Sequence, residues 1–283
     1  MLRSIKEWWN GPWRGPAKDT WDKNLYEQLI EDVRTIKFEA GIERAGILLC
    51  GPVQSGKSSF INSIFSISKG RPAYVSAAIA SERTVTLQYI KAPDNSAFKN
   101  FEIRDTTGLA EGQGFGFNIQ DLGYALNGNI KANYEFQGEE PINEKDMFFV
   151  QSPSNEDKSH CLVIVLDVKL LDTITDRLCN KVRQVLRETT KKGVPIVVIL
   201  TKIDKIYPYL LKDIKYLFHS SIVKDAVIKA ENILGIQRHN IHPVVNCDEN
   251  IKVDQIRCIP ILLALKQILR YASDHIEFHA QFD

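Results

Sequence analysis

Apolar runs of strand length alternate along most of the chain with segments whose apolar residues recur every three or four positions. The first pattern is typical of buried strands and the second of amphipathic helices. Strands are predicted at 47–50, 84–90, 101–104, 161–167, 195–200 and 241–245, and helices at 57–66, 176–191, 220–234 and 255–272. This alternation predicts an α/β fold with a mostly parallel six-stranded sheet, covered by helices on both faces and with its second strand antiparallel.

Residues 1–22 and 23–44 precede this alternation and differ from it in pattern. The first segment holds four tryptophans among glycines and prolines, which indicate an arm without a continuous helix. We expect its indoles to pack on the main domain, with a partner-binding or membrane-interface surface as the alternative. In the second segment, apolar residues at helical spacing predict an amphipathic helix of roughly 15 residues that packs on the domain formed by residues 45–283.

The domain formed by residues 45–283 contains an insertion at about 109–160, which has little periodicity. The insertion is rich in glycine and asparagine, and only DLGYALNGNI predicts a short helix. An irregular connection of this length is uncommon in a compact domain. We therefore expect a functional loop, a segment ordered by a ligand, or an inserted subdomain.

Composition and charge narrow the class of protein. Of the 283 residues, 44% are hydrophobic and 25% are charged, which is typical of a soluble globular protein. The formal net charge of +1 provides no overall field for nucleic acid or an anionic membrane. Five scattered cysteines without a CxxC pair favour a reduced, intracellular protein. No apolar run approaches the roughly 18 residues that span a bilayer, so we expect a cytoplasmic protein without a transmembrane segment.

The segment GPVQSGKS, between a predicted strand and a predicted helix, matches the phosphate-binding pattern G-x-x-x-x-G-K-[ST]. Its backbone N–H groups can form an anion nest, and the following helix points its positive end at the phosphates. Lys57 is expected to contact the β- and γ-phosphates, while the Ser58 hydroxyl ligates Mg²⁺. The nucleotide-binding residues predicted in this loop are Gly51, Gln54, Ser55, Gly56, Lys57, Ser58 and Ser59.

The segment DTTG follows the third predicted strand and supplies a second signal. Asp105 stands at the strand end, where P-loop proteins place the acid that supports Mg²⁺. The N–H of Gly108 can bond the γ-phosphate, so its position would report on the nucleotide state. Alone, the tetrapeptide is common and could be a simple Asx turn; its place after the P-loop favours a nucleotide site.

The segment TKID follows the apolar run VPIVVIL and predicts the base that is bound. The Asp204 carboxylate can accept two hydrogen bonds from guanine, from N1–H and the exocyclic amine, whereas adenine offers neither in that geometry. The Lys202 stem can lie across the base plane, and Thr201 begins the motif. A site built on such bonds discriminates strongly, because the wrong base leaves a buried carboxylate unpaired. A capping aspartate after a strand is the alternative.

Two weaker elements complete the predicted site. Thr84 or Thr86 can serve as the threonine that contacts Mg²⁺ and the γ-phosphate, and Thr84 is preferred because it stands at the predicted start of the strand. Both residues are equally well explained as ordinary strand residues. Asn246 and Cys247 follow the last predicted strand, where a loop that contacts guanine is expected.

The ordered set GPVQSGKS, DTTG and TKID resembles the GTPase G-domain family, and within it the interferon-induced protein 44 and 44-like group. The stretch AAIASE, the glycine-rich segment after DTTG and NLYEQLIEDVRTIK are similar to that group as well. The resemblance covers residues 13–272. It implies a Ras-like P-loop G domain with GTP or GDP and Mg²⁺ as ligands, and a cytoplasmic, interferon-induced protein of antiviral innate immunity. Members often carry an N-terminal TLDc-type domain, for which this chain has no room, so a short form is expected.

Three residues predict that hydrolysis is slow. Leu109 follows DTTG where Ras-like proteins have the glutamine that orients the attacking water. Val53 would crowd an arginine finger that approaches the γ-phosphate. Gln54 is a hypothetical substitute that stabilises charge or orients water, with a solvent-facing loop residue as the alternative. Lys57, Gln54 and Thr84 are the residues expected to act on the reacting phosphate.

Two functions from different classes follow. The first is a guanine-nucleotide-binding switch with slow Mg²⁺-dependent GTPase activity, an unidentified protein partner and possible nucleotide-dependent homodimers. The second is an interaction scaffold that holds nucleotide, or none, without turnover. A P-loop kinase or ABC-type ATPase is a weaker third idea, since TKID would be left unexplained.

Overall fold

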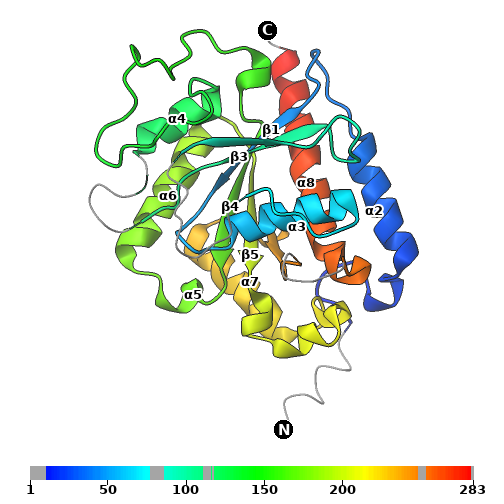
Figure 1. Cartoon of the computed structure of the whole chain (residues 1–283). Coiled ribbons are helices and arrows are strands. Elements are labelled where there is room, and N and C mark those ends of the chain that lie inside the picture. Colours follow the sequence, from blue (N-terminus) through cyan, green and yellow to red (C-terminus); the bar gives the residue numbers. More distant parts are fainter. Residues whose placement is uncertain (1–10, 77–85, 111–115, 117, 248–252, 282–283) are drawn as a thin grey trace.

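The computed structural model describes residues 11–76, 86–110, 116, 118–247 and 253–281 of the chain. Its centre is a six-stranded sheet with the strand order β2-β3-β1-β4-β5-β6 (Figure 1). β2 runs antiparallel to β3, and the other neighbouring strands are parallel, as predicted. The strands are β1 Ala45–Cys50, β2 Gln88–Lys91, β3 Phe101–Asp105, β4 Cys161–Asp167, β5 Ile196–Thr201 and β6 Ile241–Pro243.

The second and last strands are shorter than predicted. Leu87 donates its N–H to Tyr134 O (2.9 Å) and accepts from Asn133 N (2.7 Å), so residues before β2 bond to the insertion instead of to β3. The pattern of alternating residues cannot distinguish these two partners. β6 ends at Pro243, although the Val244 N–H still donates to Leu200 O (2.8 Å).

The α-helices are α2 Lys23–Thr35, α3 Lys57–Lys69, α4 Ile119–Asn127, α5 Leu170–Thr173, α6 Asp176–Lys191, α7 Ser221–Leu234 and α8 Gln255–Ala280. Short 3₁₀ turns are η2 Lys18–Thr20, η3 Asn155–Asp157, η4 Ile203–Lys205, η5 Pro208–Leu211, η6 Ile214–Tyr216 and η7 Arg238–Asn240. Side-chain oxygens of Thr175, Ser220 and Asp254 cap the first turns of α6, α7 and α8. α8 runs past the predicted end at 272 because its buried face continues to Ile276.

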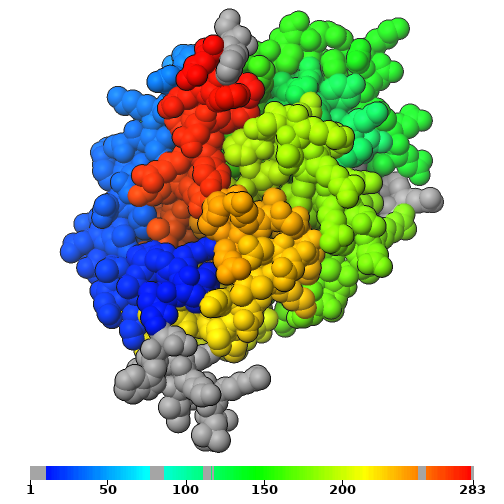
Figure 2. Space-filling model, turned by 180° about the vertical axis from the view of Figure 1, so that it is seen from behind, coloured from blue at the N-terminus to red at the C-terminus, as the bar shows by residue number. Residues whose placement is uncertain are grey.

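Two layers of helices cover the sheet (Figure 1). α3 and α8 form one layer, and α2 packs along the outside of α8. α6 and α7 form the other layer, with α4 beside α6. From behind, α8 lies between the N-terminal part of the chain and the yellow-green segments that contain α6 (Figure 2). Within the residues that the structure describes, no helix has the length and apolar character needed to cross a membrane.

The described part of the N-terminal arm packs on the domain, as the first expectation for it stated. Trp21 is fully buried, and its ring meets Phe218 edge-on with centroids 5.5 Å apart. The Trp13 ring makes a similar contact with Phe218 at 5.5 Å, and the backbone N–H of Trp13 donates to Phe218 O (2.9 Å). The Trp8 and Trp9 positions lie outside the described residues.

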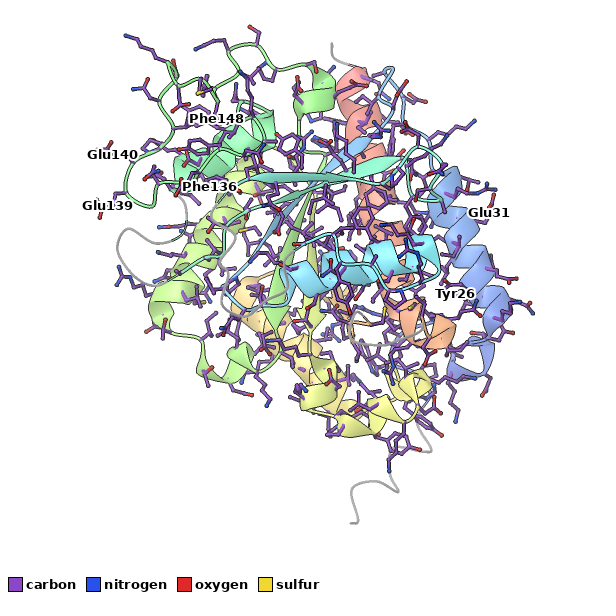
Figure 3. All side chains as sticks on the ribbon, in the orientation of Figure 1. Tyr26, Glu31, Phe136, Glu139, Glu140 and Phe148 are labelled. Atoms are coloured by element: carbon purple, nitrogen blue, oxygen red, sulfur yellow. The ribbon has the colours of Figure 1, made fainter. Side chains whose placement is uncertain are left out.

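The insertion is built around an aromatic cluster and α4, the short helix that DLGYALNGNI predicted. Tyr134 contacts Phe136 and Phe148, with ring centroids 5.4 and 6.3 Å apart. Figure 3 shows Glu139 and Glu140 at the outer edge of this segment, with both phenylalanines on its inner side. The insertion therefore has apolar packing of its own, although most of it lacks regular secondary structure.

A buried arginine in β3 ties the sheet to the end of the insertion. Arg104 is only 1% exposed, and its Nε donates to Glu102 Oε1 (2.7 Å). Its guanidinium also donates to Glu156 O (2.9 Å) and Ser159 Oγ (3.3 Å), and it lies 4.8 Å from the centre of the Tyr89 ring. Such a charge is tolerated because each side of the guanidinium meets an acceptor or an aromatic face.

We expect the free energy of unfolding to fall by about 2–4 kcal/mol between pH 7 and pH 5. Burial, aided by nearby cations, lowers the pKa of His160 and His242 to about 3 and that of His275 to about 4. Below the ordinary histidine pKa of about 6.5, the unfolded chain therefore binds protons that the folded chain does not. Burial raises the pKa of Asp105 and Asp121 to about 6. Below that pH the folded chain binds protons that the unfolded chain does not, and this offsets part of the loss of stability.

Urea denaturation at several pH values measures this effect. His242 Nε2 is 2.9 Å from Gln267 Oε1, and a glutamine amide can replace that donor. His242→Gln should reduce the fall in unfolding free energy between pH 7 and pH 5 by about 2 kcal/mol. His239→Gln, at an exposed position, is the matched control and should leave the dependence unchanged. Equal slopes for the wild type and His242→Gln would contradict the prediction.

Candidate nucleotide-binding site

The loop between β1 and α3 contains two residues in the left-handed region of backbone conformation. Gly56, the N-cap of α3, has φ 93°, a left-handed conformation that disfavours other residues. Gln54 also lies in the left-handed region, with φ 61°, and is exposed. A non-glycine residue in that region costs free energy and is most often found at functional turns.

Lys57 is held over this loop. Its Nζ donates to Gly51 O (3.2 Å) and Pro52 O (3.3 Å), and the residue is only 8% exposed. Burial lowers the pKa of the Lys57 ammonium, while the negative charge of Asp105 opposes that shift. The ammonium thus lies beside the backbone of the loop. Its two hydrogen bonds to carbonyl groups are long, and an anion can replace these partners.

Asp105 ends β3 next to the loop and is fully buried. Neither carboxylate oxygen has a donor in hydrogen-bond geometry among the described residues, although the Ser76 side chain is near enough to favour the charged form. Burial raises the pKa of this carboxyl to about 6, and the nearby Lys57 charge and Ser76 limit the rise. An unpartnered buried carboxylate is costly in isolation, and it fits a position where a bound cation supplies the missing partner.

The serines of the loop have different surroundings. Ser55 is 1% exposed, its Oγ has no hydrogen-bond partner among the described residues, and its carbonyl accepts from Thr201 Oγ1 (2.6 Å). Ser58 and Ser59 are half-buried in the first turn of α3. Ser59 O accepts from Ser63 Oγ (2.8 Å), so its carbonyl is part of the helix.

The DTTG segment lies directly against the loop. Leu109 donates its N–H to Gly51 O (2.9 Å) and accepts from Val53 N (3.1 Å). A Cβ added to Gly108 would lie 2.7 Å from Val53 Cγ2, so only glycine fits this contact. The Leu109 side chain is 5% exposed and belongs to the hydrophobic core.

The TKID segment brings a lysine across the loop from the other side. Lys202 has φ 58°, and its Nζ donates to Gln54 O (2.8 Å) and to Asp167 Oδ2 (2.8 Å). Asp204 follows in η4 with a side chain that is 11% exposed and lies 3.6 Å from Lys205 Nζ. The left-handed turn at Lys202 therefore redirects the chain after β5, and the Asp204 side chain that follows is mostly buried.

The last element differs partly from its prediction. Asn246 Nδ2 lies 3.5 Å from Gly56 O, and its Oδ1 is buried without a partner among the described residues. Cys247 instead has its thiol turned into the core, 3.2 Å from the Cys258 sulfur in α8. Its backbone N–H is already donated to Ser63 Oγ (2.9 Å), so neither group is free to contact a base.

Comparison with known proteins shows what the chain is similar to. No family model matches the chain. Interferon-induced protein 44-like from Homo sapiens is 32% identical over 255 residues, which is 88% of this chain and 56% of that protein. The chain is thus similar along most of its length to the interferon-induced protein 44 and 44-like group. Interferon-induced protein 44 from Mus musculus is 28% identical over 258 residues, 89% of this chain and 61% of that protein. The chain thus spans little more than half the length of these relatives.

Solved structures show that the chain has the Ras-like GTPase fold. A dimerization-deficient mutant of Toc33 from Arabidopsis thaliana matches with a TM-score of 0.52 at 17% identity, over 91% of this chain and 95% of that one. Toc33 in complex with GDP and Mg²⁺ matches with a TM-score of 0.50 at 17% identity, over the same shares of the two chains.

Most predicted site residues gather at the carboxyl edge of the sheet. The loop, Asp105, Gly108, Thr201, Lys202 and Asn246 are linked by the contacts above, and Asp204 is adjacent. Thr84 lies outside the described residues, and its role stays a prediction. Sequence reasoning missed Asp167, which pairs with Lys202; the signal was an acid at the end of the apolar run CLVIVLD.

Proposed function

We propose that the chain is a guanine-nucleotide-binding protein of the interferon response that hydrolyses GTP slowly with Mg²⁺. The observation that carries the proposal is the Asp105 carboxylate, which is buried without a partner beside Lys57 and the P-loop. Ser58 and Asp105, together with Thr84, would hold Mg²⁺, which offsets phosphate charge when bound. The interferon link rests on the names of the relatives, and the proposed cytoplasmic location rests on the scattered, unpaired cysteines.

Each half of the nucleotide has its own set of groups. Lys57 and backbone N–H groups of the loop around Gly56 would bind the phosphates, and the N–H of Gly108 would meet the γ-phosphate. Asp204 would accept from guanine, while the Lys202 stem, fixed by Asp167, would cover the base. The unpartnered Asn246 Oδ1 is a further acceptor in reach of that end of the loop.

Binding of guanine nucleotide is expected to stabilise the protein. At a ligand concentration of 100 times Kd, the unfolding free energy should rise by about 2.7 kcal/mol. Thermal unfolding with GDP, GTP or ATP, each with Mg²⁺, measures this shift. Lys57→Ala should abolish it, whereas Lys69→Ala, at the exposed end of the same helix, should not. A shift with ATP alone would contradict guanine binding, and no shift with any nucleotide would favour the scaffold function.

Hydrolysis is expected to be slow when the protein is dilute. The buried Leu109 side chain cannot orient water, and Val53 fills the space beside Gly108. A missing arginine finger alone accounts for roughly 10³–10⁵ in rate. Single-turnover hydrolysis of GTP over a range of protein concentrations is the test. A rate that rises with concentration would support nucleotide-dependent homodimers, in which Gln54 or a partner residue completes the site; a fast rate independent of concentration would contradict the proposal.

The scaffold that binds nucleotide without turnover remains the second candidate. It is favoured by the same Leu109 and Val53. For the homodimer, support comes from Toc33, of which one structure is a dimerization-deficient mutant. Measurement of turnover distinguishes the two candidates. The scaffold should show the thermal shift with GTP but release no phosphate.

A further inference from the structure

A cavity lies at the opposite edge of the sheet from the P-loop. Its volume is about 190 Å³. Residues that immediately precede parallel strands line it, among them Ile42 before β1, His160 before β4 and Val194 before β5. Because the P-loop follows the carboxyl end of β1, the length of that strand separates the two sites, roughly 20 Å at 3.3 Å per residue.

The ends of two helices close the cavity. Ile276 and His279 come from the last turns of α8, and Leu126 comes from the last turn of α4. In Figure 1 the end of α8 lies at the top, away from the start of α3. Figure 2 shows the same end of α8, in red, beside the green segment of the insertion. The cavity is therefore formed jointly by α8 and the insertion, segments that lie far apart in the sequence.

The lining divides into an apolar floor and a basic rim. Ile42, Leu126, Val194 and Ile276 are all at least nine-tenths buried and form the floor. The rim residues are Lys158, Lys192, His275 and His279. A ligand with an apolar body and one polar end matches this arrangement, because each part meets its own kind of surface.

The positive charges of the rim have neutral partners. Lys158 Nζ donates to Asn155 Oδ1 (2.7 Å), and Lys192 Nζ donates to Asn127 Oδ1 (2.9 Å). Across the described part of the chain, neither lysine has a carboxylate within ion-pair distance. Burial lowers the pKa of His275 to about 4, so this ring is neutral at pH 7 and the two lysines supply the positive charge. The potential at the rim is therefore positive and open to an anion.

We propose that this cavity binds a small amphiphilic anion, with its apolar body on the floor and its anionic head between Lys158 and Lys192. The volume equals roughly six water molecules at about 30 Å³ each, which suits a chain of about six carbons better than a drug-sized ligand. The charged head can replace the asparagine amides as the acceptor for both ammonium groups, and such charge-assisted bonds are the stronger ones.

Hexanoate is the probe for the test, and isoleucine methyl NMR on the full chain is the readout. Saturable shifts are expected for Ile42 and Ile276, and none for Ile61 in α3 behind the P-loop. Lys192→Met should weaken hexanoate about tenfold, because it removes one charge-assisted bond. Lys191→Met is the matched control, since this neighbour pairs with Glu188 (2.7 Å) outside the cavity, and it should have little effect.

Two further probes separate charge from apolar contact. 1-Hexanol, which lacks the charge, and inorganic phosphate, which lacks the apolar body, should each bind at least about tenfold more weakly than hexanoate. The proposal is overturned if hexanol binds as well as hexanoate, if both lysine variants behave alike, or if shifts appear at Ile61 instead. Absence of saturable shifts at Ile42 and Ile276 overturns it too. None of these outcomes depends on whether the P-loop binds nucleotide.

Discussion

Asp204→Asn should convert the protein from guanine to xanthine nucleotides. An asparagine side chain keeps one acceptor for the base N1–H but presents an N–H₂ group where the second acceptor stood. Guanine places its amine at that position, and two donors then face each other, whereas xanthine has a carbonyl there. The affinity for GDP should fall at least about a hundredfold, because hydrogen bonds within a buried site discriminate between bases by that much or more.

The measurement is titration of the wild type and Asp204→Asn with GDP and xanthosine diphosphate, each with Mg²⁺. The Asp204 side chain is 11% exposed and ends a left-handed turn, so the substitution changes little of the fold. Asp225→Asn, on the exposed side of α7, is the control and should leave both affinities unchanged. Unchanged GDP affinity in Asp204→Asn would show that another residue reads the base.

The second large effect is expected on stability. Arg104→Ala should lower the free energy of unfolding by about 3–5 kcal/mol, because it removes the partner of a buried carboxylate. Glu102 is 5% exposed and would keep only its bond to Lys91 Nζ (3.0 Å). The backbone carbonyls of Glu156 and Asp157 would lose their donor at the same time. The loss should therefore loosen the junction between β3 and the insertion.

Urea denaturation followed by tryptophan fluorescence reports this change, because Trp21 is fully buried in the native state. Arg44→Ala is the matched control: its partner Asp94 is 86% exposed, and such a surface pair contributes less than about 1 kcal/mol. The double variant Arg104→Met with Glu102→Gln should recover part of the stability, since no unpaired charge remains. Equal losses for Arg104→Ala and Arg44→Ala would contradict the role of the buried pair.

The central layer could be predicted from the sequence because it depends on local patterns. CLVIVLD and IVVILT are almost wholly apolar, and they form β4 and β5, buried nearly throughout, with bounds close to those predicted. Asp176–Lys191 has both a capping threonine and strong helical periodicity, and it was predicted without error. In these elements the burial of each residue follows from its own position in a repeating pattern.

Where an element pairs with residues that are remote in the sequence, its ends and contacts could not be predicted in the same way. Residues 86 and 87 have the residue types of a strand but pair with the insertion: Leu87 bonds to Asn133 and Tyr134, and Thr86 forms a bridge with Glu135. Cys247 follows the last strand as expected, yet Cys258 and Ser63 draw it into the core. Such outcomes depend on which segments come together in space, and no local spacing encodes that.

The sequence by itself therefore determined the alternating α/β architecture and the P-loop, DTTG and TKID segments, since each depends on residue types at short, fixed spacings. Only the tertiary structure decided that Asp105 lacks a partner, that Asp167 fixes Lys202, and that a basic cavity forms at the far edge of the sheet. These features arise where three or more segments meet, and their burial and charge are properties of the assembled chain.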